Sequence, residues 1–83
     1  MAIRLHSLAV ATLAERGATE QEILTTVVHG ETFPAKYGRT GFRRNFEYDD
    51  LWRGKHYPMK QIEAYAVHEG NGWLVNSFVT KFF

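Results

Sequence analysis

The hydrophobic pattern of the chain changes its period once, at Gly30. Before this residue, apolar side chains recur every three or four positions, which is the spacing of one helix face. After it, aromatic and β-branched residues alternate with polar ones between glycines and an Asp49–Asp50 pair, which is typical of strands and turns. The helices are therefore predicted in the first 30 residues and the strands in the rest.

Two helices are predicted, and the boundary between them is well marked. The first is expected over about Leu5–Arg16, with Gly17 as the left-handed residue that ends it. The letters TEQE at Thr19–Glu22 form a capping box, in which each end residue's side chain accepts a hydrogen bond from the other's backbone amide. The second helix begins there and is expected to stop at Gly30.

Four strands are predicted after the helices. Two are expected near Thr32–Tyr37 and Phe42–Tyr48, followed by a loop at Asp49–His56. The last third of the chain, KQIEAYAVHEGNGWLVNSFVTKFF, is predicted to be a β-hairpin with Asn71–Gly72 as its two-residue turn.

The turn position decides which hairpin residues pair with each other. A turn at Asn71–Gly72 places Tyr65 and Ser77 on opposite faces of the sheet, so both cannot line one site. A turn at Gly70–Asn71 would shift the pairing, and the sequence leaves both registers open.

The predicted fold is α+β: two N-terminal helices packed on a twisted, mainly antiparallel four-stranded sheet, in a single domain over residues 1–83. Hydrophobic residues make up 45% of the chain, which is enough for one core. The absence of cysteine excludes disulfides and thiolate zinc sites. No apolar run approaches the roughly 20 residues of a membrane span, so the expected location is cytoplasmic, without membrane contact.

Positive charge is concentrated in the middle of the chain. Residues 36–60 contain seven lysines and arginines against three acidic residues. Such a segment is a candidate for binding an anion, and a solvated basic strand is the plainer alternative. Tyr37, Trp52 and Tyr57 lie in or beside this segment, where they are candidates for stacking on unpaired bases or for the core.

Three residues are the candidates for catalysis. His6 is the leading acid or base, because histidine as a residue type suits proton transfer near neutral pH and nothing in the local pattern requires it. The alternative is a histidine at a helix start whose ring bonds a backbone carbonyl. Arg43 is the candidate for stabilising a phosphate through its planar fork. Ser77 is the third candidate, on the expected sheet floor.

Further residues are candidates for holding the substrate. They are cationic or aromatic and lie on the expected basic strand or sheet floor: Arg39, Arg44, Lys60 and Tyr65. Because neighbouring strand residues point to opposite faces, only one of Arg43 and Arg44 can face a substrate. The four histidines lack close ligand spacing, so no metal site and no cofactor are predicted.

The block H-x8-E-R-G-A-T-E-Q-E-I, the following G-R and basic aromatic strand, and the terminal hairpin resemble a family of small bacterial proteins of unknown function. That family is grouped with the RelE-like toxins of the barnase–EndoU–colicin–RelE superfamily. The resemblance implies a RelE-like fold and metal-independent RNA cleavage, with His6 as the family's histidine. The family's terminal V-x-T position reads V-N-S here, with Ser77 in place of threonine.

Two functions follow as expectations. The first is a metal-independent endoribonuclease toxin of a toxin–antitoxin system, with histidine as acid or base and arginine stabilising the phosphate. Its expected partners are RNA, including RNA on the ribosome, and an antitoxin protein. The second is a non-catalytic RNA- or protein-binding module of the same fold.

Overall fold

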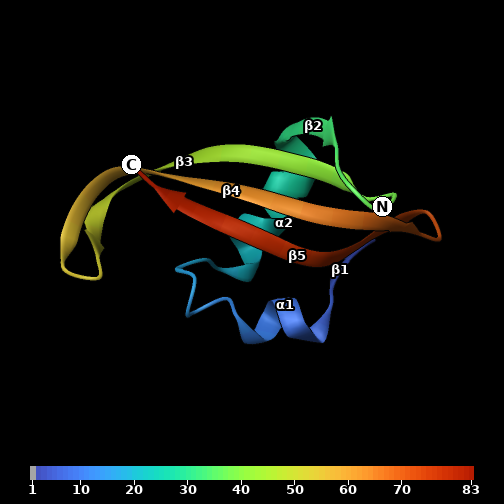
Figure 1. The fold of residues 1–83 in the computed structure, drawn as a ribbon, viewed down its shortest axis with the longest axis horizontal. Helices are drawn as coiled ribbons and strands as arrows, with labels where there is room; N and C mark the ends of the chain where they lie inside the picture. Colours follow the sequence, from blue (N-terminus) through green and yellow to red (C-terminus); the bar gives the residue numbers. More distant parts are fainter. Residues whose placement is uncertain (1) are drawn as a thin grey trace.

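The computed structural model describes residues 2–83, which form one mixed sheet with two short helices (Figure 1). The elements in chain order are β1 (Ile3–Leu5), α1 (Ser7–Ala11), α2 (Glu20–His29), β2 (Glu31–Pro34), β3 (Thr40–Trp52), β4 (Lys55–Glu69) and β5 (Gly72–Phe82). The strand order is β1-β5-β4-β3-β2, with β1 parallel to β5 and every other pair antiparallel.

The predicted fold class is wrong in its number of strands and in its helices. The sheet has five strands rather than four, and it is mixed because β1 runs parallel to β5. Leu5, expected in the first helix, is a strand residue, and the His6 amide extends the ladder by donating to the Val75 carbonyl at 2.9 Å. Leu5 fits the helical period and a strand end equally well. The free edge of β5 offers partners for the backbone groups of residues 3–6, so these residues pair there as a strand.

Only five residues of the predicted first helix are α-helical. The helix ends at Ala11 with Thr12 as its C-cap, so Gly17 is not the residue that stops it. Residues 12–17 form turns, and Gly17 has the predicted left-handed conformation, with a φ of 69°. The second helix is as predicted, with both capping-box bonds between Thr19 and Glu22 present and Gly30 as its C-cap.

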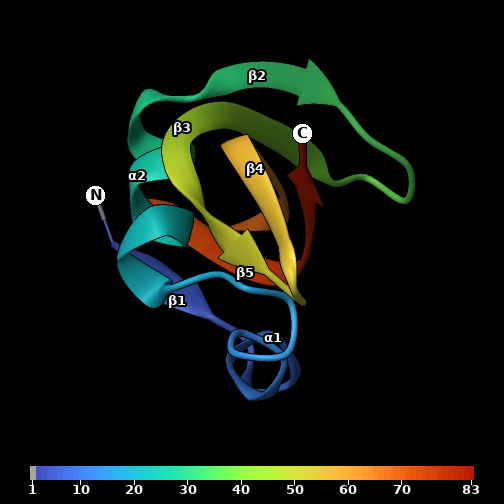
Figure 2. The same cartoon turned by 90° about the vertical axis from the view of Figure 1, so that its left-hand side faces the viewer.

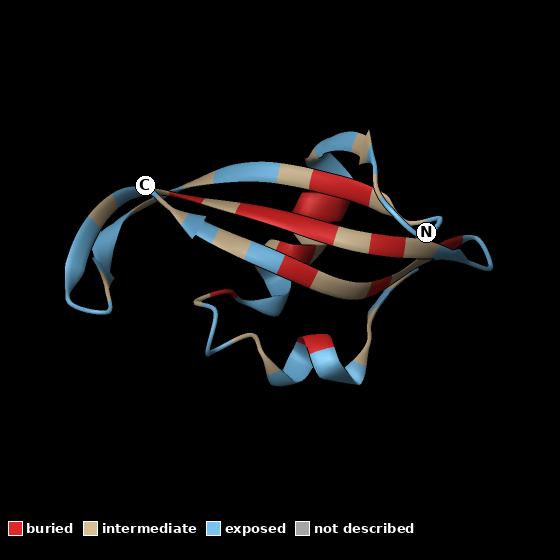
Figure 3. Cartoon of the chain, viewed as in Figure 1, coloured by how far each residue is buried: buried red, intermediate tan, exposed pale blue. Residues whose placement is uncertain are grey.

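The core lies between the helices and one face of the sheet. Figures 2 and 3 show α2 lying across this face and the buried residues gathering where helices and strands meet. The hydrophobic side chains in this layer are Ala9, Ala18, Ile23, Val27, Phe42, Ile62, Ala64, Ala66, Val75 and Phe78. Since side chains alternate along a strand, the residues between these core positions point to the opposite face, which neither helix covers and which we call the open face.

The β3–β4 hairpin is longer than predicted. The expected loop at Asp49–His56 is paired as far as Trp52 and Lys55, leaving only Arg53 and Gly54 as the turn. A bulge between Glu47 and Asp50 redirects β3, and Figure 1 shows the hairpin end curling away from the line of the sheet.

The turn of the last hairpin is Gly70–Asn71, so the predicted Asn71–Gly72 turn is wrong. Glu69 pairs with Gly72, and Gly70 has a φ of 60° at the first central position, where a type II′ turn favours glycine. Gly72 instead lies against the N-terminal segment, where a Cβ atom would be 1.7 Å from the Ala2 carbonyl oxygen. The glycine read as a turn residue is therefore needed for a close approach of two backbones.

Candidate functional site

The corrected register brings Tyr65 and Ser77 together. The two residues are directly paired on the open face of β4 and β5, with the register shift falling between Tyr65 and Ala66. The expectation that they lie on opposite faces is wrong because of this shift: Ala66 pairs with Val75, so Asn76 is an extra residue in β5 that turns Ser77 to the face of Tyr65, and neither turn position alone would do so.

Arg43 also lies on the open face, but its charge is already engaged. Its guanidinium lies 3.4 Å from a Glu63 carboxylate oxygen and 3.8 Å from one of Glu31, and it stacks over the Phe33 ring at 4.3 Å. Arg44 lies on the other side of β3 with its guanidinium 5.8 Å from the Phe46 ring centroid. The two arginines therefore lie on opposite faces, as predicted. Arg43 could bind a phosphate only by giving up its ion pairs with the carboxylates of Glu31 and Glu63.

Glu63 is the acidic centre of this network. The hydrogen bond from Lys81, at 2.9 Å, is the main cause that lowers the pKa of the Glu63 carboxyl, with a further contribution from the charge of Arg43 and opposition from burial. When folding lowers the pKa of a carboxyl, the ionised group stabilises the fold at every pH above its ordinary pKa. This stabilisation is lost as the pH falls through the lowered pKa.

Acidification is therefore expected to destabilise the wild type more than a Lys81→Met variant. Removing the ammonium lets the pKa of Glu63 rise toward its ordinary value, so less stability is lost between neutral pH and about pH 3. Urea midpoints measured across this range check the prediction, with Lys55→Met as the control on an exposed lysine. Equal acid sensitivity of wild type and Lys81→Met would count against it.

Lys60 does not lie with the other candidates. It is 5% exposed on the helix-covered face, and its ammonium donates to the Gly17 carbonyl at 3.0 Å and contacts a Glu22 carboxylate oxygen at 2.7 Å. Its placement on the substrate-binding floor is wrong, because strand alternation points it beneath α2. Lys60 ties the capped end of α2 to the sheet.

His6 has the structural role that the alternative interpretation gave it, at the start of a helix, although its ring bonds a backbone amide rather than a carbonyl. It is the N-cap of α1, where its Nδ1 accepts a hydrogen bond from the Leu8 amide at 3.1 Å. Strand β1 is separated from β3 by β5 and β4, so the backbones next to His6 and Arg43 are about 14 Å apart at normal strand spacing. The structure does not bring the predicted acid or base and the predicted phosphate ligand together.

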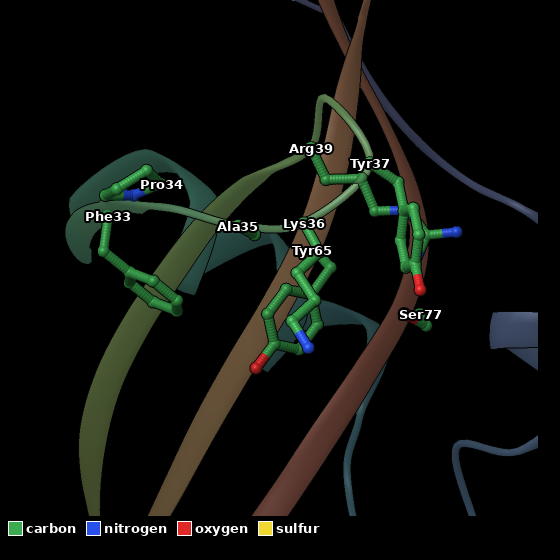
Figure 4. Close-up of a pocket in the computed structure, with 8 residues that line it drawn as sticks. All are labelled: Phe33, Pro34, Ala35, Lys36, Tyr37, Arg39, Tyr65 and Ser77. Carbon is green, nitrogen blue, oxygen red and sulfur yellow. The ribbon is translucent and has the colours of Figure 1, made fainter.

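A hollow of about 550 Å³ lies on the open face, under the loop that joins β2 to β3. Its lining residues are Phe33, Pro34, Ala35, Lys36, Tyr37, Arg39, Tyr65 and Ser77, and we call it the loop pocket. Figure 4 shows Phe33 beside β3, Tyr65 over β4 and Ser77 on β5, with the loop residues above them. Three candidates from the sequence, Arg39, Tyr65 and Ser77, meet here.

Local backbone geometry explains how the loop presents its side chains. The Arg39 amide donates to the Lys36 carbonyl at 3.2 Å around a turn whose central residues, Tyr37 and Gly38, have φ angles of 62° and 70°. Both positive angles are those of a type I′ turn, whose first central position normally holds Asn, Asp or Gly. Tyr37 is 85% exposed there, so a large aromatic ring is displayed at a position that disfavours it.

The floor of the loop pocket depends on a glycine. The Phe33 ring packs directly on Gly41, where a Cβ atom would lie 2.3 Å from the ring, and its edge meets Tyr65 with ring centroids 6.1 Å apart. Lys36 and Tyr37 complete the site, and sequence reasoning did not single them out together. The signal was a Tyr–Gly pair where a hairpin turn favours Asn–Gly.

Charge in the loop pocket is positive and unpaired. Within residues 2–83, no carboxylate lies at ion-pair distance from Lys36 or Arg39, in contrast to Arg43 and Lys60. The same residues contain no group of three or more His, Asp or Glu side chains that could hold a metal ion. The pocket thus offers two cations beside aromatic rings, together with the Ser77 hydroxyl and the hydroxyls of its two tyrosines.

Comparisons with protein-family models, with curated proteins and with solved structures find no match for this chain. The resemblance to RelE-like toxins therefore remains an expectation from the sequence. Neither helix in the described part of the chain combines the length and the apolar character needed to cross a membrane.

Proposed function

We propose that the chain is a binding module for single-stranded RNA, with the loop pocket as its site. An unpaired base would stack on Tyr37 or Tyr65, and Lys36 and Arg39 would hold the flanking phosphates. Aromatic side chains beside cations are the usual means by which proteins bind unpaired nucleotides, because every base has a π-face and every linkage a charge.

Tyr37 is the observation that carries this proposal. A non-glycine residue in the left-handed region costs about 1–2 kcal/mol, and exposure of the ring leaves that cost without compensation from packing. Strain of this kind persists where function requires the side chain. Stacking of one base on an aromatic ring contributes about 1–3 kcal/mol, which is enough to offset it.

The composition of the loop pocket favours binding over cleavage. Its lining includes no histidine and no carboxylate, the side chains most suited to move a proton from a ribose hydroxyl. The nearest of the predicted catalytic residues, Ser77, lacks a base beside it among the lining residues. Endoribonuclease activity remains a prediction from the sequence.

Replacing Tyr37 with asparagine is expected to stabilise the protein while weakening RNA binding. Asparagine suits the type I′ turn, so the free energy of unfolding should rise by about 1 kcal/mol. Loss of the ring should lower the affinity for a labelled, unstructured RNA octamer by about tenfold. Urea denaturation and fluorescence anisotropy measure the two effects on the same sample.

Two lysine variants distinguish RNA binding in the loop pocket from attraction of RNA by the positive charge of the protein as a whole. Lys36→Ala should weaken binding of a uridine dinucleotide, which is short enough to occupy the loop pocket alone, and should reduce its salt dependence. Lys55→Ala, at the far hairpin end, removes the same charge with little effect on this short ligand. Equal RNA affinities of wild type and Tyr37→Asn would refute the proposal. A DNA octamer of the same sequence shows whether the ribose hydroxyl matters.

The same RNA samples test the ribonuclease expectation. His6→Asn keeps a good N-cap on α1 while removing the titratable ring, so it is a better variant than His6→Ala. RNA fragments that form with the wild type and not with His6→Asn would favour the endoribonuclease over the binding module.

A further inference from the structure

A second hollow lies beside the free edge of β5, between the turn at residues 12–17 and the end of the β3–β4 hairpin. It has a volume of about 300 Å³, and we call it the edge hollow. Its lining residues are Glu15, Arg16, Trp52, Arg53, Val79, Thr80 and Phe82. Two arginines from segments far apart in the sequence therefore meet at one place.

Both guanidinium groups are held by backbone and keep N–H groups to spare. Arg16 donates from Nη1 to the Phe78 carbonyl at 2.6 Å, and Arg53 donates from Nη2 to the Glu15 carbonyl at 3.0 Å. Neither has a carboxylate at ion-pair distance among residues 2–83, and a guanidinium has five donors. The two side chains are thus positioned before any ligand arrives, which suits them to a phosphate.

An aromatic pair forms the wall between these arginines. Trp52 stacks on Phe82 with ring centroids 4.9 Å apart, and the Arg53 guanidinium lies 5.0 Å from the Trp52 ring centroid. These contacts keep the hairpin end against β5 and hold Arg53 in place. The edge hollow is therefore a built feature of the fold rather than a gap between mobile side chains.

The edge hollow and the loop pocket meet across the free edge of β5. Thr80 and Phe82, which line the edge hollow, pair with Ile62 and Lys60 on the helix-covered face, and Val79 brings the rim of this hollow to the open face. Ser77 lines the loop pocket and Val79 lines the edge hollow. The two residues are two positions apart on the open face, about 7 Å along the strand. Val79 is 38% exposed, so this short path is an apolar surface open to solvent.

We propose that RNA bound in the loop pocket continues along β5 into the edge hollow, where Arg16 and Arg53 hold another phosphate of the same strand. This inference rests on the function proposed above. It adds the direction in which the bound RNA strand runs and the minimum length of RNA that reaches both sites. Glu15 is the one carboxylate that lines the edge hollow, and it opposes the phosphate there.

Binding of oligouridylates of two to eight nucleotides tests the proposal, measured by calorimetry on the whole chain. The affinity of the wild type should rise until both sites are covered and then level off. Arg53→Gln should weaken binding of the octamer about fivefold with little effect on the dinucleotide, since a charge-assisted hydrogen bond is lost only with the longer ligand. It should also reduce the salt slope for the octamer by about 0.7, the value for one phosphate on a single strand.

Two more variants make the result specific. Glu15→Gln should strengthen octamer binding about twofold, because it removes a repulsive charge whose side chain holds no structural contact in the hydrogen bonds and ion pairs of residues 2–83. Tyr37→Asn should weaken binding at every length. Thermal melting of Arg53→Gln, which keeps an amide donor for the Glu15 carbonyl, shows that the hairpin end is intact.

The outcomes distinguish this inference from the function on which it rests. No binding at any length would overturn both. An affinity that does not depend on length, or an equal loss for dinucleotide and octamer in Arg53→Gln, would overturn the path along β5 and leave the loop pocket as the RNA site.

Discussion

Replacing Lys60 with alanine is expected to lower the free energy of unfolding by about 3 kcal/mol. The lysine is buried, and its ammonium lies 2.7 Å from a Glu22 carboxylate oxygen and 3.0 Å from the Gly17 carbonyl. Alanine leaves both acceptors without their cation. Removal of one partner from a buried ion pair is more damaging than replacement of the pair, because the remaining charge stays poorly solvated.

Chemical denaturation followed by circular dichroism measures this loss, and two comparisons make it specific. Lys55→Ala, an exposed lysine on the same strand, should change the free energy of unfolding by less than about 0.5 kcal/mol. Lys60→Met combined with Glu22→Gln should be less destabilising than the sum of the two single variants, because the double variant leaves no unpaired charge. Similar losses in Lys60→Ala and Lys55→Ala would contradict the structural role of Lys60.

Replacing Gly72 with alanine is expected to cost about 2–3 kcal/mol by overcrowding. The new methyl group would lie 1.7 Å from the Ala2 carbonyl oxygen, so β1 has to move away from β5. That movement breaks the hydrogen bond from the Trp73 amide to Ala2, which is 2.8 Å long, and strains the pairing of Ile3 with Trp73.

Amide hydrogen exchange locates this effect better than global stability alone. In Gly72→Ala, the Trp73 and His6 amides, which bond across β1 and β5, should lose protection more than amides in the β3–β4 pair. Asn71→Ala, in the adjacent turn, is the control and should leave β1 protected. Unchanged protection of Trp73 in Gly72→Ala would show that the chain can accommodate a side chain there.

What the sequence predicted well depends on local chemistry. The second helix is marked by the Thr19–Glu22 capping box and by Gly30, and both signals act within a few residues of where they stand. The first helix was overextended because Leu5 satisfies a helical period while its backbone pairs with β5, about 70 residues later in the chain. Periodicity within a window cannot report a partner outside it.

The same difference between local and distant partners explains which site residues the sequence placed correctly. Alternation along β3 was enough to place Arg43 and Arg44 on opposite faces, but the carboxylates that neutralise Arg43 come from β2 and β4. The pairing of Tyr65 with Ser77 depends on Asn76, the extra residue that a bulge inserts into β5, and no local signal in the sequence marks it. The turn itself was hidden because Gly72 serves a contact with Ala2. Lys60 was misplaced because a buried lysine is recognisable only through its partner on α2.

The position of β1 in the sheet has a consequence for how the chain folds. β2 to β5 form a meander whose neighbouring strands are joined by short turns, so their contacts need only short loops to close. β1 has one strand neighbour, β5, and Ile3 and Trp73 are separated by nearly the whole chain. Because the partner of β1 is an edge of the β4–β5 hairpin, we expect this hairpin to form first and the N-terminal residues, with the α1 cap at His6, to become ordered last.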